Sequence, residues 1–418
     1  MDAPFSLRRL WAVVRDNRGF RRLYAANAVS QVGDWFNVVA LFSLLVELTG
    51  AGQAVALALL TRFIPTFLAG PAAGVLADRV SRRTILVASD LLRAALVLCL
   101  LLVRSPGQVW IAYAVVTAHS VVSAFFDTAQ TATYPTLVPP EDLPFAATLE
   151  NSLWSVTLAA GSALGGVVLA LTSRDVAFVL DAASFLGSAL LLARLPISKA
   201  QRREGPANLL GLKDLRDGIL YVVRHRRVRA LLTVKASFGL TLGGALVLLA
   251  FFGEKVFQHG NGKGIAILWT ARGIGSFLGP FAAFRFVGHD DRGLRRSIAG
   301  AFALLVLCYC GFALSPAIGW AACALLLANA GGSILWTSGS TLLQRLVPDA
   351  VRGRVAAAEM GGFMLALTAS TLTVGVLLDR GVPPRALMAA CGLVALLPLA
   401  FWISVQPAFQ VTDGRAPE

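Results

Sequence analysis

Twelve apolar stretches, each about 20 residues long, recur along the whole chain and constrain its fold more than any other feature. A helix rises about 1.5 Å per residue, so 20 residues cross the roughly 30 Å hydrocarbon core of a bilayer. In lipid only a helix satisfies the backbone hydrogen bonds of a single span, so each stretch predicts a membrane-spanning helix. The predicted spans are, by residue number, roughly 24–47, 53–77, 84–103, 108–130, 146–171, 176–195, 230–252, 264–286, 297–314, 318–340, 355–379 and 385–405.

The composition excludes an ordinary soluble protein of this length. Of the 418 residues, 56% are hydrophobic and only 14% are charged, whereas about 25% of a typical soluble domain is charged. The first stretch differs from a cleaved signal peptide, because it starts late, contains Asp34 and lacks a small-residue cleavage site before a polar segment. We therefore expect a multi-pass protein of the inner (plasma) membrane.

Basic residues gather on one side of the predicted spans. With the first segment inside, the predicted cytoplasmic segments hold 27 of the 37 Lys and Arg residues, and the outer loops hold six. This bias is the positive-inside rule, so we expect both termini to face the cytoplasm. The net charge of +14 then serves topology and contact with anionic lipid, and it does not indicate nucleic-acid binding.

The two halves of the sequence repeat at an offset of 209 residues. Parallel repeats of this kind are typical of transporters with a central site. We therefore predict an N-terminal six-helix bundle at 1–195, a cytoplasmic linker with an amphipathic helix at 196–229, and a C-terminal six-helix bundle at 230–418. The matching segments are Val13-Val14-Arg15 with Val222-Val223-Arg224, Thr61 with Thr270, Gly70-Pro71 with Gly279-Pro280, Leu137-Val138-Pro139 with Leu346-Val347-Pro348, and Glu150 with Glu359.

A charged turn between the second and third spans carries the most specific motif. Residues 74–83 read GVLADRVSRR, which resembles the G-x-L-x-D-R-x-G-R-R signature of the major facilitator superfamily, with Ser81 where that family usually has Gly. Segments 20–36, 137–152 and 179–185 resemble the branch that contains macrolide-efflux proteins and the enterobactin exporter. The resemblance implies an all-α membrane protein of 12 transmembrane helices in two parallel six-helix halves.

The resemblance also implies a conformational latch on the inner face. Asp78 would cap the start of the eleventh span near Val355, where an anion is stabilised by about 0.3–1 kcal/mol, and Arg82 or Arg83 would pair with Asp127. A static salt-bridged turn is the alternative. The predicted latch residues, including those of the repeated turn, are Gly74, Asp78, Arg79, Arg82, Arg83, Asp127, Asp291 and Arg292.

Charges inside the spans are the candidates for coupling and substrate binding, because each costs about 2.5–3.5 kcal/mol at the bilayer centre without a partner. Asp34 and Arg62 fall at similar depth, so we expect them to pair, either as a proton or cation switch or as a permanent structural pair. Asp181 is a candidate for a cavity acid. Arg272 is a candidate contact for an anionic substrate.

The remaining charges within or beside the spans have simpler interpretations. Asp90 and Arg93 are one turn apart and should satisfy each other. Lys235 is close enough to the cytoplasmic end of its span to reach the surface. Glu150 and Glu359 fall near the starts of two spans, where we expect them to act as helix caps.

Rival functions find little support. A primary pump would need a G-x-x-x-x-G-K-[ST] nucleotide loop, which is missing from the sequence, and the scattered His and Cys residues indicate no enzyme, metal site or cofactor. The run GSALGG at 161–166 resembles an antiporter signature, with Ser162 in place of Pro. We predict a proton-coupled, monomeric exporter of amphiphilic small molecules such as a drug, a siderophore or a secreted metabolite. A lipid or lysolipid translocase and an uptake carrier remain open alternatives.

Overall fold

The computed structural model describes residues 7–195, 212–286 and 290–409, and within them the regular structure is entirely helical. Twelve of its helical segments are long and apolar enough to cross a membrane, so the predicted spans are confirmed. The helices are α1 (Leu7–Asp16), α2 (Arg18–Thr49), α3 (Gly52–Arg79), α4 (Arg82–Leu98), α5 (Val109–Leu137), α6 (Leu143–Leu171), α7 (Arg174–Ala193), α8 (Leu212–Arg224), α9 (Arg226–Phe251), α10 (Lys263–Phe286), α11 (Asp291–Ala313), α12 (Ile318–Leu346), α13 (Asp349–Asp379), α14 (Pro384–Val394) and α15 (Leu396–Val405).

The repeat that the sequence predicts reappears in the helix bounds. Helix α5 begins at Val109 and ends at Leu137, while α12 begins at Ile318 and ends at Leu346, so both bounds differ by 209 residues. A short helix rich in basic residues precedes the first long helix of each half: α1 comes before α2, and α8 comes before α9. The two halves are therefore built from corresponding segments in the same order.

The chain folds into two units, each of which packs mainly on itself. Within the described residues, unit 1 holds 7–49, 57–195 and 261–266, and unit 2 holds 50–56, 212–260, 267–286 and 290–409. The predicted division at 195 and 230 stays a prediction, and residues 196–211 of the predicted linker lie outside the described residues.

In unit 1, α2 packs on α6 and α7, and α4 packs on α5 and α7. One apolar cluster of this unit joins α2, α4, α5 and α7, with Leu23, Leu86, Phe126 and Leu192 among its fully buried members. This packing places the polar side chains of α2 against α5, α6 and α7, where the candidate site lies.

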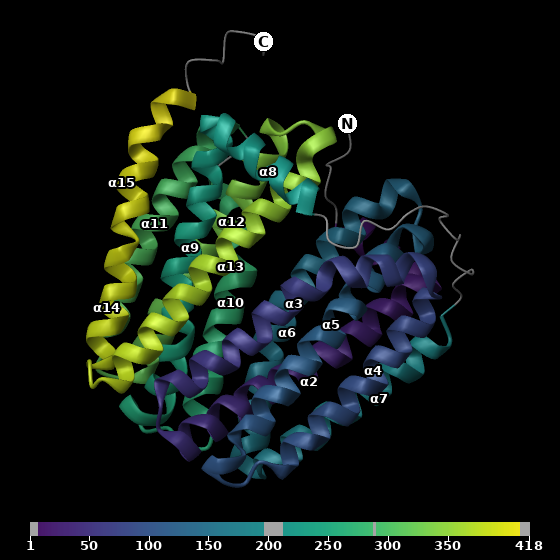
Figure 1. Cartoon of the computed structure of the whole chain (residues 1–418), viewed down its shortest axis with the longest axis vertical. Helices are drawn as coiled ribbons and strands as arrows, with labels where there is room; N and C mark the ends of the chain where they lie inside the picture. The colour runs from purple at the N-terminus through teal and green to yellow at the C-terminus, as the bar shows by residue number, and fades with distance from the viewer. Residues whose placement is uncertain (1–6, 196–211, 287–289, 410–418) are drawn as a thin grey trace. The chain divides into compact units, whose positions relative to one another are not determined.

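Unit 2 repeats this packing with the corresponding helices. Helix α9 packs on α13 and α14, and α11 packs on α12 and α14, as the labelled helices of this unit show in Figure 1. Helix α8 also lies against α13, at Gly218, where a Cβ would come within 2.5 Å of the Arg354 carbonyl oxygen. The amphipathic helix of the predicted linker thus packs on the last long helix of the same unit.

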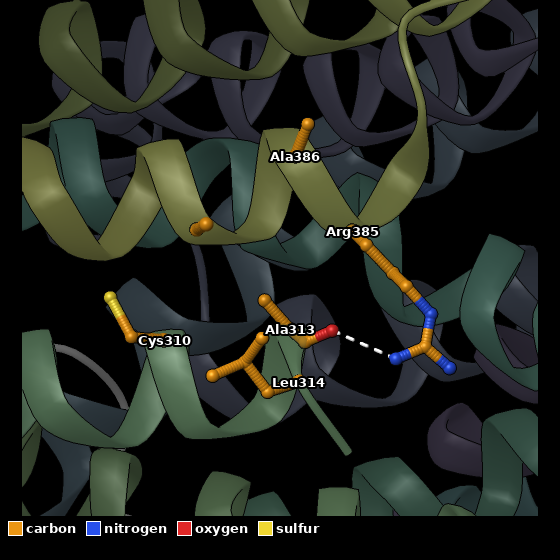
Figure 2. Close-up of a pocket in the computed structure, with 6 residues that line it drawn as sticks. Cys310, Ala313, Leu314, Arg385 and Ala386 are labelled. Carbon is orange, nitrogen blue, oxygen red and sulfur yellow. Dashed lines mark hydrogen bonds between the residues drawn. The ribbon is translucent and has the colours of Figure 1, made fainter. Parts of the chain in front are cut away.

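Arg385, near the start of α14, stabilises the end of α11. Its guanidinium donates hydrogen bonds to the carbonyl oxygens of Ala313 at 2.9 Å and of Ser315 at 2.8 Å, and cations are favoured at a helix C-terminus. Figure 2 shows this contact beside a pocket lined mainly by Cys310, Leu314 and alanine side chains. Because the charge of Arg385 already serves the helix end, we do not place the functional site at this pocket.

Candidate functional site

Asp34 lies in the middle of α2 and faces a histidine of α5. Its Oδ1 atom is 3.5 Å from Nε2 of His119, and the two side chains are 16% and 11% exposed. The predicted pairing of Asp34 with Arg62 is not seen, because no ion pair within 4 Å joins them in the described part of the chain. Arg62 instead lies with its guanidinium carbon 5.9 Å from the centre of the Trp35 ring, a cation–π distance.

Asp181 of α7 is fully buried against α2. Its Oδ2 accepts a hydrogen bond of 2.9 Å from Asn37, and its Oδ1 has no hydrogen-bond partner among the described residues. A Cβ at Gly33 would come within 2.6 Å of Oδ1 and would clash with the Ser184 hydroxyl. The close approach of α2 and α7 therefore depends on glycine at this position.

Asp90 and Arg93 of α4 form the buried ion pair that their spacing predicts. The Arg93 guanidinium also lies 4.1 Å from the centre of the Phe126 ring and 4.6 Å from that of Phe185. Both charges are almost completely shielded from solvent. We therefore assign this pair to the packing of α4 against α5 and α7.

Glu150 is the eighth residue of α6 and does not cap its helix, contrary to the expectation from the sequence. Its Oε2 accepts hydrogen bonds from Asn27 of α2 at 3.0 Å and from Gln130 of α5 at 3.3 Å. Gln130 also donates a hydrogen bond to the Tyr134 hydroxyl, one turn later on α5. The carboxylate consequently ties α6 to α2 and α5 through neutral partners.

Lys235 and Glu359 form an ion pair inside unit 2, which corrects two expectations. The Lys235 Nζ lies 2.9 Å from Oε1 of Glu359, 2.8 Å from the Ser340 hydroxyl and 4.3 Å from the centre of the Trp336 ring. Lys235 is 4% exposed and does not reach the surface. Glu359 lies ten residues after the start of α13 and pairs with Lys235 instead of capping the helix.

Arg272 of α10 is buried within unit 2. Its guanidinium carbon lies 4.9 Å from the centre of the Trp269 ring, one turn earlier on the same helix. Stacking on an aromatic face is a favourable setting for a guanidinium group away from water. A role for Arg272 toward an anionic substrate stays a prediction.

Two of the predicted latch residues, Arg82 and Asp291, contact other residues of their own units. Arg82 donates a hydrogen bond of 2.6 Å to the Ala132 carbonyl of α5, and Asp127 forms no ion pair within 4 Å in the described residues. Asp291 pairs with Arg345 of α12 at 2.5 Å. The side chains of Asp78, Arg79, Arg83 and Arg292 are exposed, and a Cβ at Gly74 would meet open space. The contact predicted between Asp78 and Val355 would join the two units and stays a prediction.

Two functional candidates were missed from the sequence: His119 beside Asp34, and the pairing of Lys235 with Glu359. His119 sits alone in an apolar stretch, so only the packing of α2 on α5 reveals its neighbour. The 209-residue offset could have drawn attention to Glu359, because it aligns a second acid with Glu150 at the same place in the other half. Among the described residues, no group of three His, Cys, Asp or Glu side chains could hold a metal ion.

Comparison with known proteins places the chain among transporters. Residues 10–416 match the transmembrane secretion effector family. The MFS-type transporter YkuC of Bacillus subtilis is 29% identical over 243 residues, which cover 56% of each chain. Macrolide efflux protein A of Streptococcus pyogenes is 27% identical over 217 residues, covering 51% of this chain and 54% of that protein. The matched part thus spans just over half the length of these relatives.

Solved structures share the fold at low sequence identity. A mutant of the peptide transporter POT matches with a TM-score of 0.73 and 14% identity, covering 94% of this chain and 95% of that one. The nucleoside transporter NupG matches with a TM-score of 0.67 and 13% identity over 95% and 99% of the two chains. These relatives are transporters and not enzymes. The chain therefore belongs to the transmembrane secretion effector family of the major facilitator superfamily, and twelve of its helical segments are long and apolar enough to cross a membrane.

Proposed function

We propose that this transporter is a proton-coupled exporter of amphiphilic small molecules, such as a drug, a siderophore or another secreted metabolite. The observation that carries the proposal is Asp34, a partly exposed acid in the middle of a membrane span. An intramembrane acid is costly and marks an ion or substrate pathway by default. The macrolide-efflux relatives favour export and amphiphilic substrates.

In this proposal Asp34 binds the transported proton, with His119 as its immediate neighbour. No arginine nitrogen lies within 4 Å of this carboxylate in the described residues. Arg62 lies beside the ring of Trp35, the residue that follows Asp34 in the sequence. Asp181 and Arg272 are the further candidates for contact with substrate.

Transport would proceed by alternating access of the two six-helix halves. The protein would lie in the inner (plasma) membrane as a monomer, with both termini in the cytoplasm. The charged turn at 74–83 would close the inner face by the latch described above. The exposure of Asp78 and Arg79 leaves them available for such a contact. Asp78→Asn should then weaken the closed inner face and lower export without lowering the amount of protein.

The test is cellular accumulation of labelled macrolides, cationic dyes and catecholate siderophores. Cells that lack the transporter, cells with the wild type and cells with Asp34→Asn are compared with and without a protonophore. Wild type should lower the accumulation of one class, and both the protonophore and Asp34→Asn should restore it at equal protein levels. Unchanged accumulation of the whole panel would favour the alternatives, a lipid or lysolipid translocase or an uptake carrier.

The matched control is Asp16→Asn. Asp16 ends α1, outside the membrane-spanning helices, and is exposed. The hydrogen bond from Arg15 lowers the pKa of the Asp16 carboxyl, so this group stays ionised at the pH of the assay and cannot carry a proton. Asp16→Asn should export as the wild type does, and a loss equal to that of Asp34→Asn would contradict a specific role for Asp34.

A further inference from the structure

The carboxylate of Glu150 has an oxygen that nothing in the described structure uses. Its Oε2 accepts the hydrogen bonds from Asn27 and Gln130, whereas its Oε1 is buried and has no hydrogen-bond partner in the described part of the chain. In a membrane interior an unused charged oxygen is costly. A purely structural role for Glu150 therefore leaves its Oε1 atom unexplained.

The charges around Glu150 do not compensate for it. Among the described residues, no Lys, Arg or His nitrogen lies within the 4 Å of an ion pair with Glu150, although the other ion pairs of these helices are present. The titratable groups that face it are Tyr24 on α2, and Tyr134 and Asp127 on α5. Neither tyrosine carries a positive charge and Asp127 is an acid, so none of these groups supplies a counter-charge to the carboxylate.

A one-way chain of hydrogen bonds ends at this carboxylate. The Thr157 hydroxyl donates to Oε1 of Gln31 at 2.8 Å, and the Gln31 amide donates to Oδ1 of Asn27 at 3.0 Å. The Asn27 amide then donates to Glu150. Because the Gln31 and Asn27 amides both donate toward Glu150, Oε2 is held in place whether or not the group is ionised. Only Oε1 is left to take a proton.

Exposure separates Glu150 from Asp181, another acid with no Lys or Arg nitrogen within 4 Å among the described residues. Asp181 is 0% exposed, so water does not reach it. Glu150 is partly exposed as a residue, whereas its Oε1 atom is buried. Glu359, its equivalent at the 209-residue offset, is held by the Lys235 ammonium at 2.9 Å. The repeat thus places one paired acid and one unpaired acid at corresponding positions.

We infer that Glu150 is a second proton-binding site of this transporter, with Oε1 as the atom that takes the proton. One O–H bond of a hydronium ion breaks and one O–H bond to Oε1 forms, which leaves a water molecule. The inference deepens the proposed function and rests on its proton coupling. In this role Glu150 is neutral in one conformation of the transport cycle and ionised in another.

The first test is infrared difference spectroscopy of the purified full chain in lipid nanodiscs, recorded while the pH is stepped between acidic and basic values. Wild type, Glu150→Gln, Glu150→Asp and Asp34→Asn are compared. We expect one protonated-carboxyl band to disappear in Glu150→Gln, to remain in Asp34→Asn and to return, shifted, in Glu150→Asp. An unchanged set of bands in Glu150→Gln overturns the inference.

The second test is transport of ethidium in proteoliposomes under an imposed pH gradient. Glu150→Gln should lose transport driven by the gradient and should still equilibrate ethidium down its own concentration gradient, because the neutral amide copies the protonated acid. Gradient-driven transport at the wild-type rate would overturn the coupling role. The two tests also separate the two proposals: if wild type ignores the pH gradient, the proposed function fails, and the infrared bands alone decide whether Glu150 binds a proton.

Discussion

Glu150 and Glu359 occupy corresponding positions in the two halves, yet their surroundings differ in charge. Glu359 meets a lysine ammonium, a serine hydroxyl and a tryptophan ring. Glu150 accepts hydrogen bonds from two side-chain amides, neither of them charged. The acid of unit 2 is therefore neutralised by a lysine, whereas the acid of unit 1 has no cationic partner among the described residues.

The different partners of Glu150 and Glu359 indicate which half of a repeated fold can carry a function of its own. The two halves keep the same helix order and the same packing partners, since α2 packs on α6 and α7 as α9 packs on α13 and α14. Repeat-related packing alone thus fixes the fold. We propose that the change of charge during transport falls in the half whose acid has no cationic partner among the described residues.

The largest effect should come from breaking the pair of unit 2. Lys235→Met removes the cation and leaves Glu359 as a buried charge, which costs about 3–5 kcal/mol. Thermal unfolding of the purified protein in detergent measures the loss. The double variant with Glu359→Gln removes both charges and should recover most of it. Equal destabilisation in the single and double variants would show that Lys235 acts by packing and not by charge.

The next effect should come from the close contact between α2 and α7 in unit 1. Gly33→Ala places a Cβ against the Ser184 hydroxyl, inside van der Waals contact, and such overpacking costs about 1–3 kcal/mol. Gly187→Ala is the control on α7, because its Cβ would meet no atom nearer than the Val29 side chain at 4.0 Å. Unfolding temperatures that fall equally in both variants would contradict the specific contact.

A smaller effect should follow from Ser340→Ala, which removes one acceptor from Lys235. The ion pair with Glu359 and the Trp336 ring remain, so we expect a loss of about 0.5–1.5 kcal/mol, the usual contribution of one hydrogen bond. Comparing the loss of stability caused by Ser340→Ala in the wild type and in the Lys235→Met background gives the contribution of the Lys235–Ser340 hydrogen bond. A loss that persists unchanged without Lys235 would mean that the serine acts elsewhere.

The smallest effect on stability should come from Glu150→Gln. The amide oxygen keeps the hydrogen bonds from Asn27 and Gln130, and no cation loses its partner within the described residues. We expect the free energy of unfolding to change by less than about 1 kcal/mol. Glu359→Gln is the matched variant and should lose several times more, since it leaves Lys235 unpaired. A similar loss of unfolding free energy in both variants would show that the two acids do not differ in their dependence on a cation.

The sequence predicted the fold far better than the contacts of its charged residues. Span length and the 209-residue repeat depend on apolar content, which the bilayer imposes on every helix, so the twelve spans and the family were accessible. The partners of Asp34 and Lys235 depend on how helices rotate against each other. A rotation of one residue, about 100°, changes which side chain faces which. For this reason similar depth along two spans predicts a pair of Asp34 with Arg62, whereas Asp34 meets His119 in the structure.

The short helices α1 and α8 precede the first long helix of each half, and this placement has a consequence for biosynthesis. Each half begins with its own stretch of basic residues ahead of its first apolar segment, and such stretches hold the start of a nascent membrane protein on the cytoplasmic side. Two separately translated polypeptides, divided ahead of α8, should therefore insert with the same orientation. Co-expression of the two pieces would then restore a working carrier from two genes.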